Sequence, residues 1–302
     1  MGSQSAVSVV VVSYNTRDLL RRCLNCIEPC HEVIVVDNAS QDGSADMVAA
    51  EFPHVRLIRN AENRGFGAAN NQGIDVASRP LALLLNSDAF PEPGAIERLA
   101  REFEDLGVVA AGGRLLNEDG STQDSAAGPL TLGVVAAEQL YLERWLRLYW
   151  RRPERTQEVQ QVMGACLMFR PVERFDERYF LYCEDTDLCR RLRAHGRILY
   201  VPEARVTHLL GSSSNANRWL AIARYNAGKE LYFRIHRGRV ASGVCWGLDR
   251  LGALLRLAVW SLIWAATLGR RGSGQPRTFW RVLTAPAGGP PRPSRTGGGP
   301  PT

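Results

Sequence analysis

The chain has 302 residues, of which 45% are hydrophobic and 23% are charged. These are ordinary values for a globular protein, and they exclude a fibrous or wholly disordered chain. Seven cysteines in this length are too few for a disulfide scaffold. The apolar run at 7–12 has no basic leader, so we expect no secretory signal and a cytoplasmic protein.

The net charge of +6 is distributed unevenly along the chain. Fourteen basic and two acidic residues lie beyond position 217, a net charge of +12, so the first 217 residues carry −6. A mildly acidic body is unlike the basic groove that binds a phosphate backbone, and we therefore expect no nucleic acid partner. An anionic partner should instead be sought in the C-terminal part.

Short β-branched runs alternate with helical patterns over the first third of the chain. We expect strands at 7–13, 32–37, 55–59, 81–85 and 108–111. We expect helices between them, at 16–27, 44–51, 67–77 and 93–106. This alternation predicts an α/β fold with a mostly parallel central sheet and helices on both faces.

The pattern is weaker beyond Gly112, and 121–158 shows no clear period. Further on we expect a strand at 162–170, a helix at 185–194, two short strands at 198–201 and 205–208, and helices at 218–236 and 244–268. The chain therefore divides into an α/β domain at 1–217, a basic helical extension at 218–285 and a Gly- and Pro-rich tail at 286–302, which we expect to be disordered.

Polar clusters follow four of the predicted strands, at the edge where open parallel sheets bind ligands. They are Ser13-Tyr14-Asn15, Asp37-Asn38, Asn63-Arg64-Gly65 and Asn86-Ser87-Asp88. Turns need polar residues, so one such cluster indicates little. Four that converge, with an aromatic ring, two carboxylates and a guanidinium, suit a nucleotide.

Asp88 is the best candidate for a metal contact in this group. Mg²⁺ or Mn²⁺ prefers oxygen ligands and stabilises the charge of a departing diphosphate. Asp88 is too far from the helix predicted at 93–106 to cap it, because Pro91 and Pro93 intervene.

A second acidic block, Glu184-Asp185-Thr186-Asp187, opens the helix predicted at 185–194. Acids at a helix N-terminus complement its dipole, which accounts for part of the cluster. The aromatic run at 179–182 precedes it and should raise the pKa of at least one carboxyl by desolvation. A carboxylate in such a place can deprotonate an attacking hydroxyl.

Six segments, in this order and at these intervals, resemble the rhamnosyltransferase-like branch of the family 2 glycosyltransferases. They are Val-Val-Ser-Tyr-Asn (11–15), Val-Val-Asp-Asn-Ala-Ser (35–40), Asn-Arg-Gly-Phe-Gly-Ala-Ala-Asn-Asn-Gln-Gly (63–73), Asn-Ser-Asp (86–88), Gly-Ala-Cys-Leu-Met (164–168) and Glu-Asp-Thr-Asp-Leu (184–188). The resemblance covers about the first two thirds of the chain. It implies a Rossmann-like GT-A fold and transfer of a sugar from a nucleoside diphosphate sugar with inversion.

The resemblance also implies roles for individual residues. Tyr14 and Asn15 would line the nucleoside pocket, Asp37 would bond the base or ribose, and Arg64 would lie over the nucleotide. Asp88 would hold a divalent metal (Mg²⁺ or Mn²⁺), His208 would approach the metal or the diphosphate, and Asp185 would be the general base. We expect the rest of the nucleotide-sugar site to be formed by Ser13, Asn63, Gly65, Ser87 and Glu184.

Three motifs depart from familiar patterns. The family's common Asp-x-Asp is Asn86-Ser87-Asp88 here, as in the rhamnosyltransferase-like branch. The group Cys23, Cys26, Cys30 and His31 has zinc-ligand types, but its first two members lie in a predicted helix and no second ligand pair follows, so we expect no zinc site. Gly65-x-Gly67 follows the third strand and lacks a third glycine, so it is no Rossmann phosphate loop.

The helix predicted at 244–268 has two faces on a helical wheel. One carries Arg and Trp, and the other carries Leu and Val. Such a helix either packs on the α/β domain or lies at an anionic membrane surface, and the charge of +12 favours the membrane. Arg256 argues against a true membrane span.

The sequence thus predicts an inverting glycosyltransferase at the inner face of the cell membrane. We expect dTDP-rhamnose as the donor and a polyprenyl-linked or cell-surface glycan as the acceptor. Three alternatives remain open: another donor such as a UDP-hexose, a nucleotide-sugar-binding protein without turnover, and a membrane scaffold. The scaffold leaves the polar clusters unexplained, and a pure binder has no use for a base at Asp185.

Overall fold

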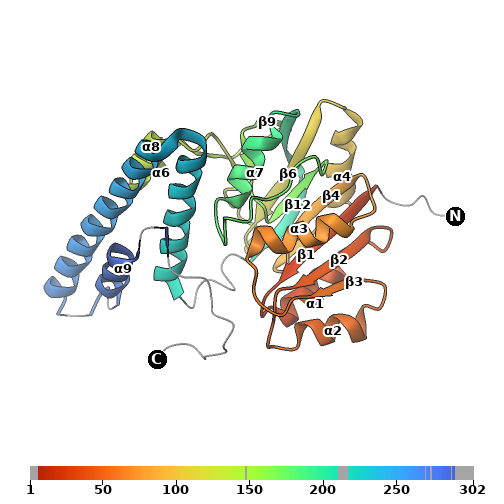
Figure 1. Cartoon of the computed structure of the whole chain (residues 1–302), viewed down its shortest axis with the longest axis horizontal. Helices are drawn as coiled ribbons and strands as arrows, with labels where there is room; N and C mark the ends of the chain where they lie inside the picture. The colour runs from red at the N-terminus through yellow and green to blue at the C-terminus, as the bar shows by residue number, and fades with distance from the viewer. Residues whose placement is uncertain are drawn as a thin grey trace.

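The computed structural model describes residues 6–146, 148–209, 217–268, 270–272, 274–286 and 288–289. Of the predicted tail at 286–302, only residues 286, 288 and 289 lie within this range. Figure 1 shows a central sheet flanked by helices, with the long helix α8 and the short helix α9 standing to one side.

The first third of the chain forms the predicted strands and helices with small differences at their ends. The strands are β1 (Val7–Ser13), β2 (Glu32–Asp37), β3 (Arg56–Arg59), β4 (Leu81–Asn86), β5 (Ala89–Pro91) and β6 (Val108–Leu116). The helices are α1 (Arg17–Asn25), α2 (Ser44–Glu51), α3 (Phe66–Val76) and α4 (Ala95–Arg101). The helix predicted to reach residue 106 is shorter, because its α-helical turns end at Arg101 and a 3₁₀ turn (Glu102–Glu104) follows.

The middle of the chain holds several short elements that the sequence did not reveal. They are β7 (Ala126–Ala127), α5 (Leu132–Gln139), α6 (Glu143–Leu146), β8 (Trp150–Arg151) and β9 (Gln157–Val159). The single strand predicted at 162–170 is wrong, because β10 (Gln161–Val162) and β11 (Cys166–Phe169) belong to different sheets. The two strands predicted at 198–201 and 205–208 are one strand, β12 (Arg197–His208), with a register shift between Val201 and Arg205.

The main sheet has the order β3-β2-β1-β4-β11-β6-β12-β5, and β9 pairs with β12. Strands β3, β2, β1 and β4 are parallel, as are β6 and β12, whereas β11 is antiparallel to both of its neighbours. A second, three-stranded sheet has the order β10-β7-β8. The mostly parallel α/β sheet predicted from the sequence is therefore confirmed.

Both faces of the main sheet are buried, which explains why its central strands are continuous apolar runs. Val9 and Val11 of β1 belong to a core covered by α1, α2 and α4. Val10, between them, faces the opposite core, which is covered by α3 and α7 (Glu184–Leu192). Alternate residues of one strand therefore anchor two helical layers.

The helical extension contains the two helices predicted at 218–236 and 244–268, and the break between them falls at Gly238. Helix α8 (Arg218–Ala266) runs through both predicted ranges, with a kink at Gly238, where φ is 85°. We call the segments before and after this kink its first arm and its second arm. Helix α9 (Gln275–Thr284) was not predicted, and it packs on α8.

A small core joins this extension to the rest of the molecule, and a buried ion pair joins its two arms. Tyr232 and Phe233 of the first arm pack with Val135 of α5 and with Tyr179. Lys229 is fully buried and donates to Asp249 of the second arm at 2.7 Å, so it ties the two arms together. Among the described residues no helix is both long and apolar enough to cross a membrane.

Candidate active site

Three parallel strands bring the predicted polar clusters to one edge of the sheet. In the β1–β2 register Ser13 faces Asp37, and in the β1–β4 register Val12 faces Asn86. The chain runs outward from β1 to β3 and then returns to the other side of β1 with β4, so the strand order reverses here. Open α/β sheets bind ligands at such a point.

Asp37 has one carboxylate oxygen available for a ligand. Its side chain is buried, and Oδ2 accepts a hydrogen bond from the backbone N–H of Ser40 at 3.0 Å. Its Oδ1 is buried and has no hydrogen-bond partner among the described residues. Buried polar atoms in folded proteins nearly always have a partner, so an unpaired acceptor at a ligand-binding edge indicates a donor on a bound molecule.

Asn38, next to it, organises the loop that follows β3. Its Oδ1 accepts from the backbone N–H of Arg64 at 3.0 Å, and its Nδ2 donates to Asn63 at 2.9 Å. Asn63 in turn accepts from the backbone N–H of Gly65 at 2.9 Å. The structure therefore gives the predicted residue Asn63 a loop-shaping contact.

A chain of hydroxyl groups links the ends of β1 and β4. The Oγ of Ser13 lies 3.0 Å from that of Thr16, and Thr16 donates to Ser87 at 2.9 Å. All three side chains are buried. The sequence analysis missed Thr16, although a threonine just before a helix signals an N-cap; here its hydroxyl bonds Ser87 and does not cap α1.

Tyr14 and Asn15 form the rim of this edge. Asn15 has φ 54°, its backbone N–H donates to Ser40, and its Oδ1 accepts from the backbone N–H of Gln41 at 2.7 Å. These contacts join the loop after β1 to the loop after β2. Tyr14 is 41% exposed, so its ring is available for stacking.

The loop after β3 also touches the segment that leads into α7. Gly65 has φ 88°, and a Cβ at this position would lie 2.5 Å from the carbonyl oxygen of Phe180. The same oxygen accepts from the backbone N–H of Phe66 at 3.0 Å. Arg64 lies nearby with an exposed guanidinium 3.5 Å from Glu177. Only glycine fits this contact without strain, which explains its place in the motif.

Asp88 and His208, the two predicted metal ligands, are adjacent. His208 Nε2 lies 3.4 Å from Asp88 Oδ1, and both side chains are buried. His208 Nδ1 lies 3.1 Å from Gln123 Oε1. The amide nitrogen of Gln123 donates to other groups, so its Oε1 accepts and Nδ1 carries the proton. Nε2 then accepts a hydrogen bond from Nδ2 of Asn86 at 3.3 Å and lies beside Asp88.

This donor set fits a divalent metal. A ligating histidine is usually held by a hydrogen bond through its other nitrogen, as Gln123 holds His208, and a metal at Nε2 would take the place of the hydrogen bond from Asn86. Asp88 supplies a carboxylate oxygen, which Mg²⁺ and Mn²⁺ prefer. Gln123, which fixes the ring, lies in the region without a clear period, and the sequence gave no signal for it.

Glu184 and Asp185 begin α7, as the acidic block predicted. Asp185 Oδ2 accepts from the backbone N–H of Gly164 at 3.0 Å, and Oδ1 accepts from that of Thr186 at 2.7 Å. Burial raises the pKa of its carboxyl above the ordinary value. Burial and the neighbouring charge of Asp185 raise the pKa of Glu184 to about 8. The desolvation predicted from the aromatic run is therefore present.

One short segment connects the metal-binding pair to Asp185. The backbone N–H of Asn86, two residues before Asp88, donates to the carbonyl oxygen of Ala165 at 3.1 Å. Gly164, the preceding residue, donates to Asp185. The Gly-Ala-Cys motif thus links the end of β4 to the carboxylate of Asp185.

Asp187, the third acidic residue of this block, makes contacts that hold α7 in place. Its Oδ1 lies 2.7 Å from Nε2 of His236, and its Oδ2 accepts from Arg191 at 2.9 Å. These contacts tie α7 to the first arm of α8. Because these contacts occupy lone pairs of both carboxylate oxygens, Asp187 has fewer free lone pairs left to offer a reacting group.

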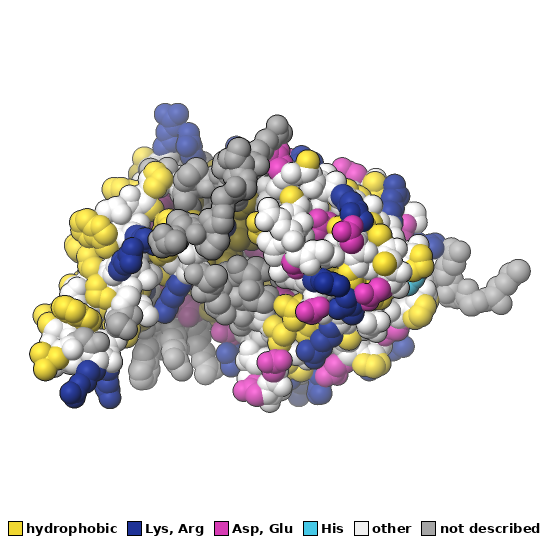
Figure 2. Space-filling view, turned by 90° about the horizontal axis from the view of Figure 1, so that it is seen from below, with side chains coloured by type: hydrophobic (Ala, Val, Ile, Leu, Met, Phe, Trp, Pro, Cys, Tyr) yellow, Lys and Arg dark blue, Asp and Glu magenta, His cyan; other side chains and the backbone are white. Residues whose placement is uncertain are grey.

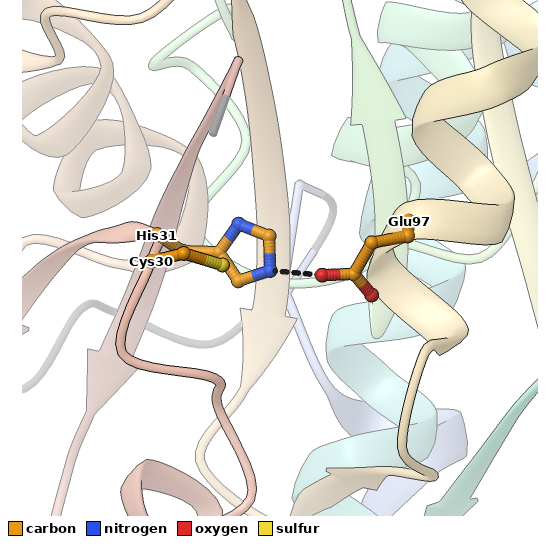
Figure 3. A group of neighbouring side chains, drawn as sticks. All are labelled: Cys30, His31 and Glu97. Atoms are coloured by element: carbon orange, nitrogen blue, oxygen red, sulfur yellow. Dashed lines mark hydrogen bonds and ion pairs between the residues drawn. The ribbon is translucent and has the colours of Figure 1, made fainter. Parts of the chain in front are cut away.

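The Cys23–His31 motif does not form one site. Cys23 Sγ lies 3.6 Å from the carbonyl oxygen of Asn86, inside the core. His31 comes just before β2, whereas Asp37 ends it, so the two lie about 20 Å apart at opposite edges of the sheet. Figure 3 shows the His31 ring directed at Glu97 of α4, with Nε2 3.1 Å from Oε1 and Cys30 beside it. This pair joins α4 to the start of β2, away from the predicted nucleotide edge.

Comparison with known sequences agrees with this geometry. A model of the family described as glycosyl transferase family 2 matches residues 8–174. The N-acetylglucosaminyl-diphospho-decaprenol L-rhamnosyltransferase of Mycobacterium tuberculosis is 31% identical over 229 residues, which cover 66% of this chain and 75% of that protein.

Two solved structures show the same fold at low sequence identity. The mannosyltransferase PcManGT of Pyrobaculum calidifontis, in complex with GDP-Man and Mn²⁺, matches with a TM-score of 0.53 and 14% identity, over 93% of this chain and 86% of that chain. GalNAc-T7 with UDP, GalNAc and Mn²⁺ matches with a TM-score of 0.52 and 15% identity, over 76% of this chain and 48% of that chain. These likenesses confirm the predicted GT-A fold.

Proposed function

Because the chain belongs to glycosyltransferase family 2, we propose that it transfers L-rhamnose from dTDP-rhamnose, with inversion, to an acceptor linked to a polyprenyl diphosphate. The observation that carries this proposal is the likeness, over two thirds of the chain, to a rhamnosyltransferase whose name states a diphospho-decaprenol acceptor. A UDP-hexose is the second candidate for the donor, because one of the structures that share the fold holds UDP.

The donor nucleotide would bind along the edge formed by β1, β2 and β4. The unpaired Oδ1 of Asp37 would accept from the base or the ribose. The exposed ring of Tyr14 offers a stacking surface, and Arg64 a positive charge. The other predicted residues mostly shape this edge, through the contacts of Ser13, Asn15, Asn63, Gly65 and Ser87.

Asp88 and His208 would hold the divalent cation. When bound there, Mg²⁺ or Mn²⁺ neutralises charge on the diphosphate that leaves. Gln123 keeps His208 in the tautomer whose Nε2 can ligate. The single carboxylate of Asn86-Ser87-Asp88 suffices in this arrangement, because His208 supplies a second protein ligand.

Asp185 would take the proton of the acceptor hydroxyl. Each of its carboxylate oxygens accepts one backbone N–H, which fixes the carboxylate; Oδ1 also accepts from the hydroxyl of Thr186, and Oδ2 keeps a lone pair for the acceptor proton. The raised pKa makes it a stronger base than an exposed aspartate. Inversion requires the acceptor hydroxyl to attack the sugar on the side opposite the leaving diphosphate. A base at Asp185, separated from Asp88 by the segment Gly164–Ala165, would suit this attack.

The second arm of α8 would lie on an anionic cytoplasmic leaflet. Nine large apolar residues on it are each at least 40% exposed: Val240, Val244, Trp246, Leu251, Leu254, Leu255, Val259, Leu262 and Trp264. Figure 2 shows hydrophobic side chains gathered at this end of the molecule, with basic side chains close by. An exposed apolar patch of this kind, with the basic residues Arg270 and Arg271 following it, suits a membrane surface.

A donor panel tests this proposal. The purified protein is incubated with Mn²⁺, a synthetic N-acetylglucosaminyl-diphospho-polyprenol and one of several nucleotide sugars, and release of the nucleoside diphosphate is measured. We expect acceptor-dependent release from dTDP-rhamnose and a product of opposite anomeric configuration. Faster transfer from a UDP-hexose would replace the donor assignment by the second candidate.

A further inference from the structure

A cavity of about 760 Å³ lies where the helical extension meets the α/β domain. The loop at 178–182 forms one wall, the two arms of α8 form two others, and Gly288 and Gly289 also line the cavity. The volume is within the usual range for a small-molecule site. The residues assigned above to the donor and the metal do not line it.

The walls of this cavity follow from the helical repeat. The first arm contributes residues at a spacing of three or four, which is one face of a helix, and so does the second arm. These residues are Arg224, Ala227, Gly228, Leu231 and Arg234 on the first arm, and Arg239, Ser242, Gly243 and Trp246 on the second. The non-helical backbone at Gly238 turns the chain between the two arms, so one face of each arm borders the space.

The cavity has an excess of positive charge. Four arginines line it, and one of them, Arg178, is neutralised by Asp176 at 2.6 Å. Within the described residues, Arg224, Arg234 and Arg239 have no carboxylate partner. The one acidic residue in the lining is Glu230, which accepts from the backbone N–H of Gly288 at 3.3 Å. Three unpaired guanidinium groups against one carboxylate favour an anionic ligand.

Arg224 in particular is placed for recognition. Its guanidinium lies 4.9 Å from the centre of the Phe180 ring, which orients it. It is half-buried, and desolvation lowers its pKa, so an anion beside it would restore stabilisation that water no longer gives. It also lies close enough to Tyr14 to interact with it electrostatically. The cavity therefore adjoins the predicted nucleotide edge.

The cavity also adjoins the proposed base. Tyr182 of its wall lies three residues before Asp185 in the chain. A Cβ added to Gly228 would lie 2.5 Å from the carbonyl oxygen of Tyr182, so the first arm is in close contact with this loop. On the other side, Arg239 and Gly243 lie next to Val240 and Val244, which are exposed on the second arm.

We propose that this cavity binds the diphosphate of the lipid-linked acceptor. Its sugar would extend past Tyr182 toward Asp185, and its polyprenyl chain would leave along the apolar side of the second arm. This inference rests on the proposed function for the identity of the acceptor. The donor diphosphate binds elsewhere, at Asp88 and His208, so the two diphosphates occupy separate sites.

The test uses geranyl diphosphate as a soluble probe, with inorganic pyrophosphate as the free anion. Binding to the full chain is measured by calorimetry in EDTA, so that the metal-dependent donor site does not contribute, and without vesicles. We expect geranyl diphosphate to bind more tightly than pyrophosphate. The double substitution Arg234→Gln and Arg239→Gln should weaken geranyl diphosphate binding by at least about tenfold. The control Arg237→Gln, on an exposed arginine outside the lining, should leave it unchanged.

A kinetic experiment tests this proposal independently of the identity of the donor. The double variant should raise the KM for a diphosphate-linked acceptor, while the KM for the donor and transfer to an alkyl glycoside of the same sugar stay as in the wild type. Equal losses on both acceptors, equal affinity for pyrophosphate and geranyl diphosphate, or binding insensitive to the double substitution would each overturn the cavity assignment. A protein that transfers no rhamnose but shows the predicted geranyl diphosphate binding would refute the donor and keep the cavity.

Discussion

His208 Nε2 lies 3.4 Å from Asp88 Oδ1, although the two residues are 120 positions apart in the sequence. Strand β12 delivers His208 to this point, and its pairing with β5 places His208 opposite Ala89, the residue after Asp88. Gln123 then fixes the ring through Nδ1. The sheet topology thus brings the two proposed metal ligands together in a chain that lacks the family's common Asp-x-Asp.

We predict that Asp88→Ala and His208→Ala each weaken Mn²⁺-dependent binding of dTDP by at least about tenfold, since even the loss of a group that orients a ligand costs this much. Calorimetry with Mn²⁺ and with EDTA measures the effect. The control Asp18→Ala, an exposed residue of α1, should behave like the wild type. Unchanged Mn²⁺-dependent affinity in both variants would remove the pair as the metal site.

The sequence predicted the central strands well because both faces of the sheet are buried. The runs at Val7–Ser13, Glu32–Asp37 and Leu81–Asn86 are almost wholly apolar, because a strand that is buried on both faces carries apolar residues at successive positions. Their polar ends then mark the ligand edge. Tyr14, Asp37, Asp88 and Asp185 could be identified because each directly follows a strand or begins a helix.

The missed parts depend on contacts between distant segments. Strands β7 and β8 are two residues long each, and they exist only because they pair with one another and with β10. No local repeat can reveal such elements, and Gln123 lies just before them. The break at Gly238, by contrast, falls between the helices predicted at 218–236 and 244–268.

Glu184 makes stability depend on pH. Its carboxyl has a pKa of about 8 in the folded protein against an ordinary 4.5, so the folded state keeps a proton that the unfolded state releases. The free energy of unfolding should therefore fall as the pH rises from about 4.5 to about 8. We predict that Glu184→Gln, which stays neutral, is more stable than the wild type at pH 8 by up to a few kcal/mol, at about 1.4 kcal/mol per pKa unit.

Thermal unfolding of both proteins at pH 5 and pH 8 measures this effect. The gain should shrink markedly at pH 5, where Glu184 is already protonated when folded. Glu118→Gln, in an exposed turn, provides a matched control and should show no such difference between the two pH values. A gain of equal size at both pH values would mean that the substitution acts through packing and not through the charge.

The apolar side of the second arm should control membrane binding. We predict that Leu251→Gln, Leu254→Gln and Leu262→Gln together abolish co-sedimentation with vesicles that contain anionic lipid, because each removes about 1.5–3 kcal/mol of buried apolar side chain. Leu106→Gln, on the 86% exposed leucine of the α/β domain, should have no effect. Equal co-sedimentation of the triple variant and the wild type would contradict the membrane assignment.

Asp185 should also set the acidic limb of the pH profile. A base must be deprotonated to act, so transfer should fall as the pH drops through the pKa of Asp185. Burial raises this pKa, so the fall should begin at a higher pH than an ordinary aspartate gives. A rate that stays constant down to pH 4 would argue against a buried aspartate as the base.

The most direct test of the account is to measure transfer and nucleotide binding on Asp185→Asn in parallel. Asparagine keeps the size of the side chain but cannot take a proton. We predict that transfer falls by about 10²–10⁴-fold while the affinity for dTDP in Mn²⁺ stays within about twofold of the wild type. Transfer within a few-fold of the wild type, with binding intact, would contradict the assignment of Asp185 as the base.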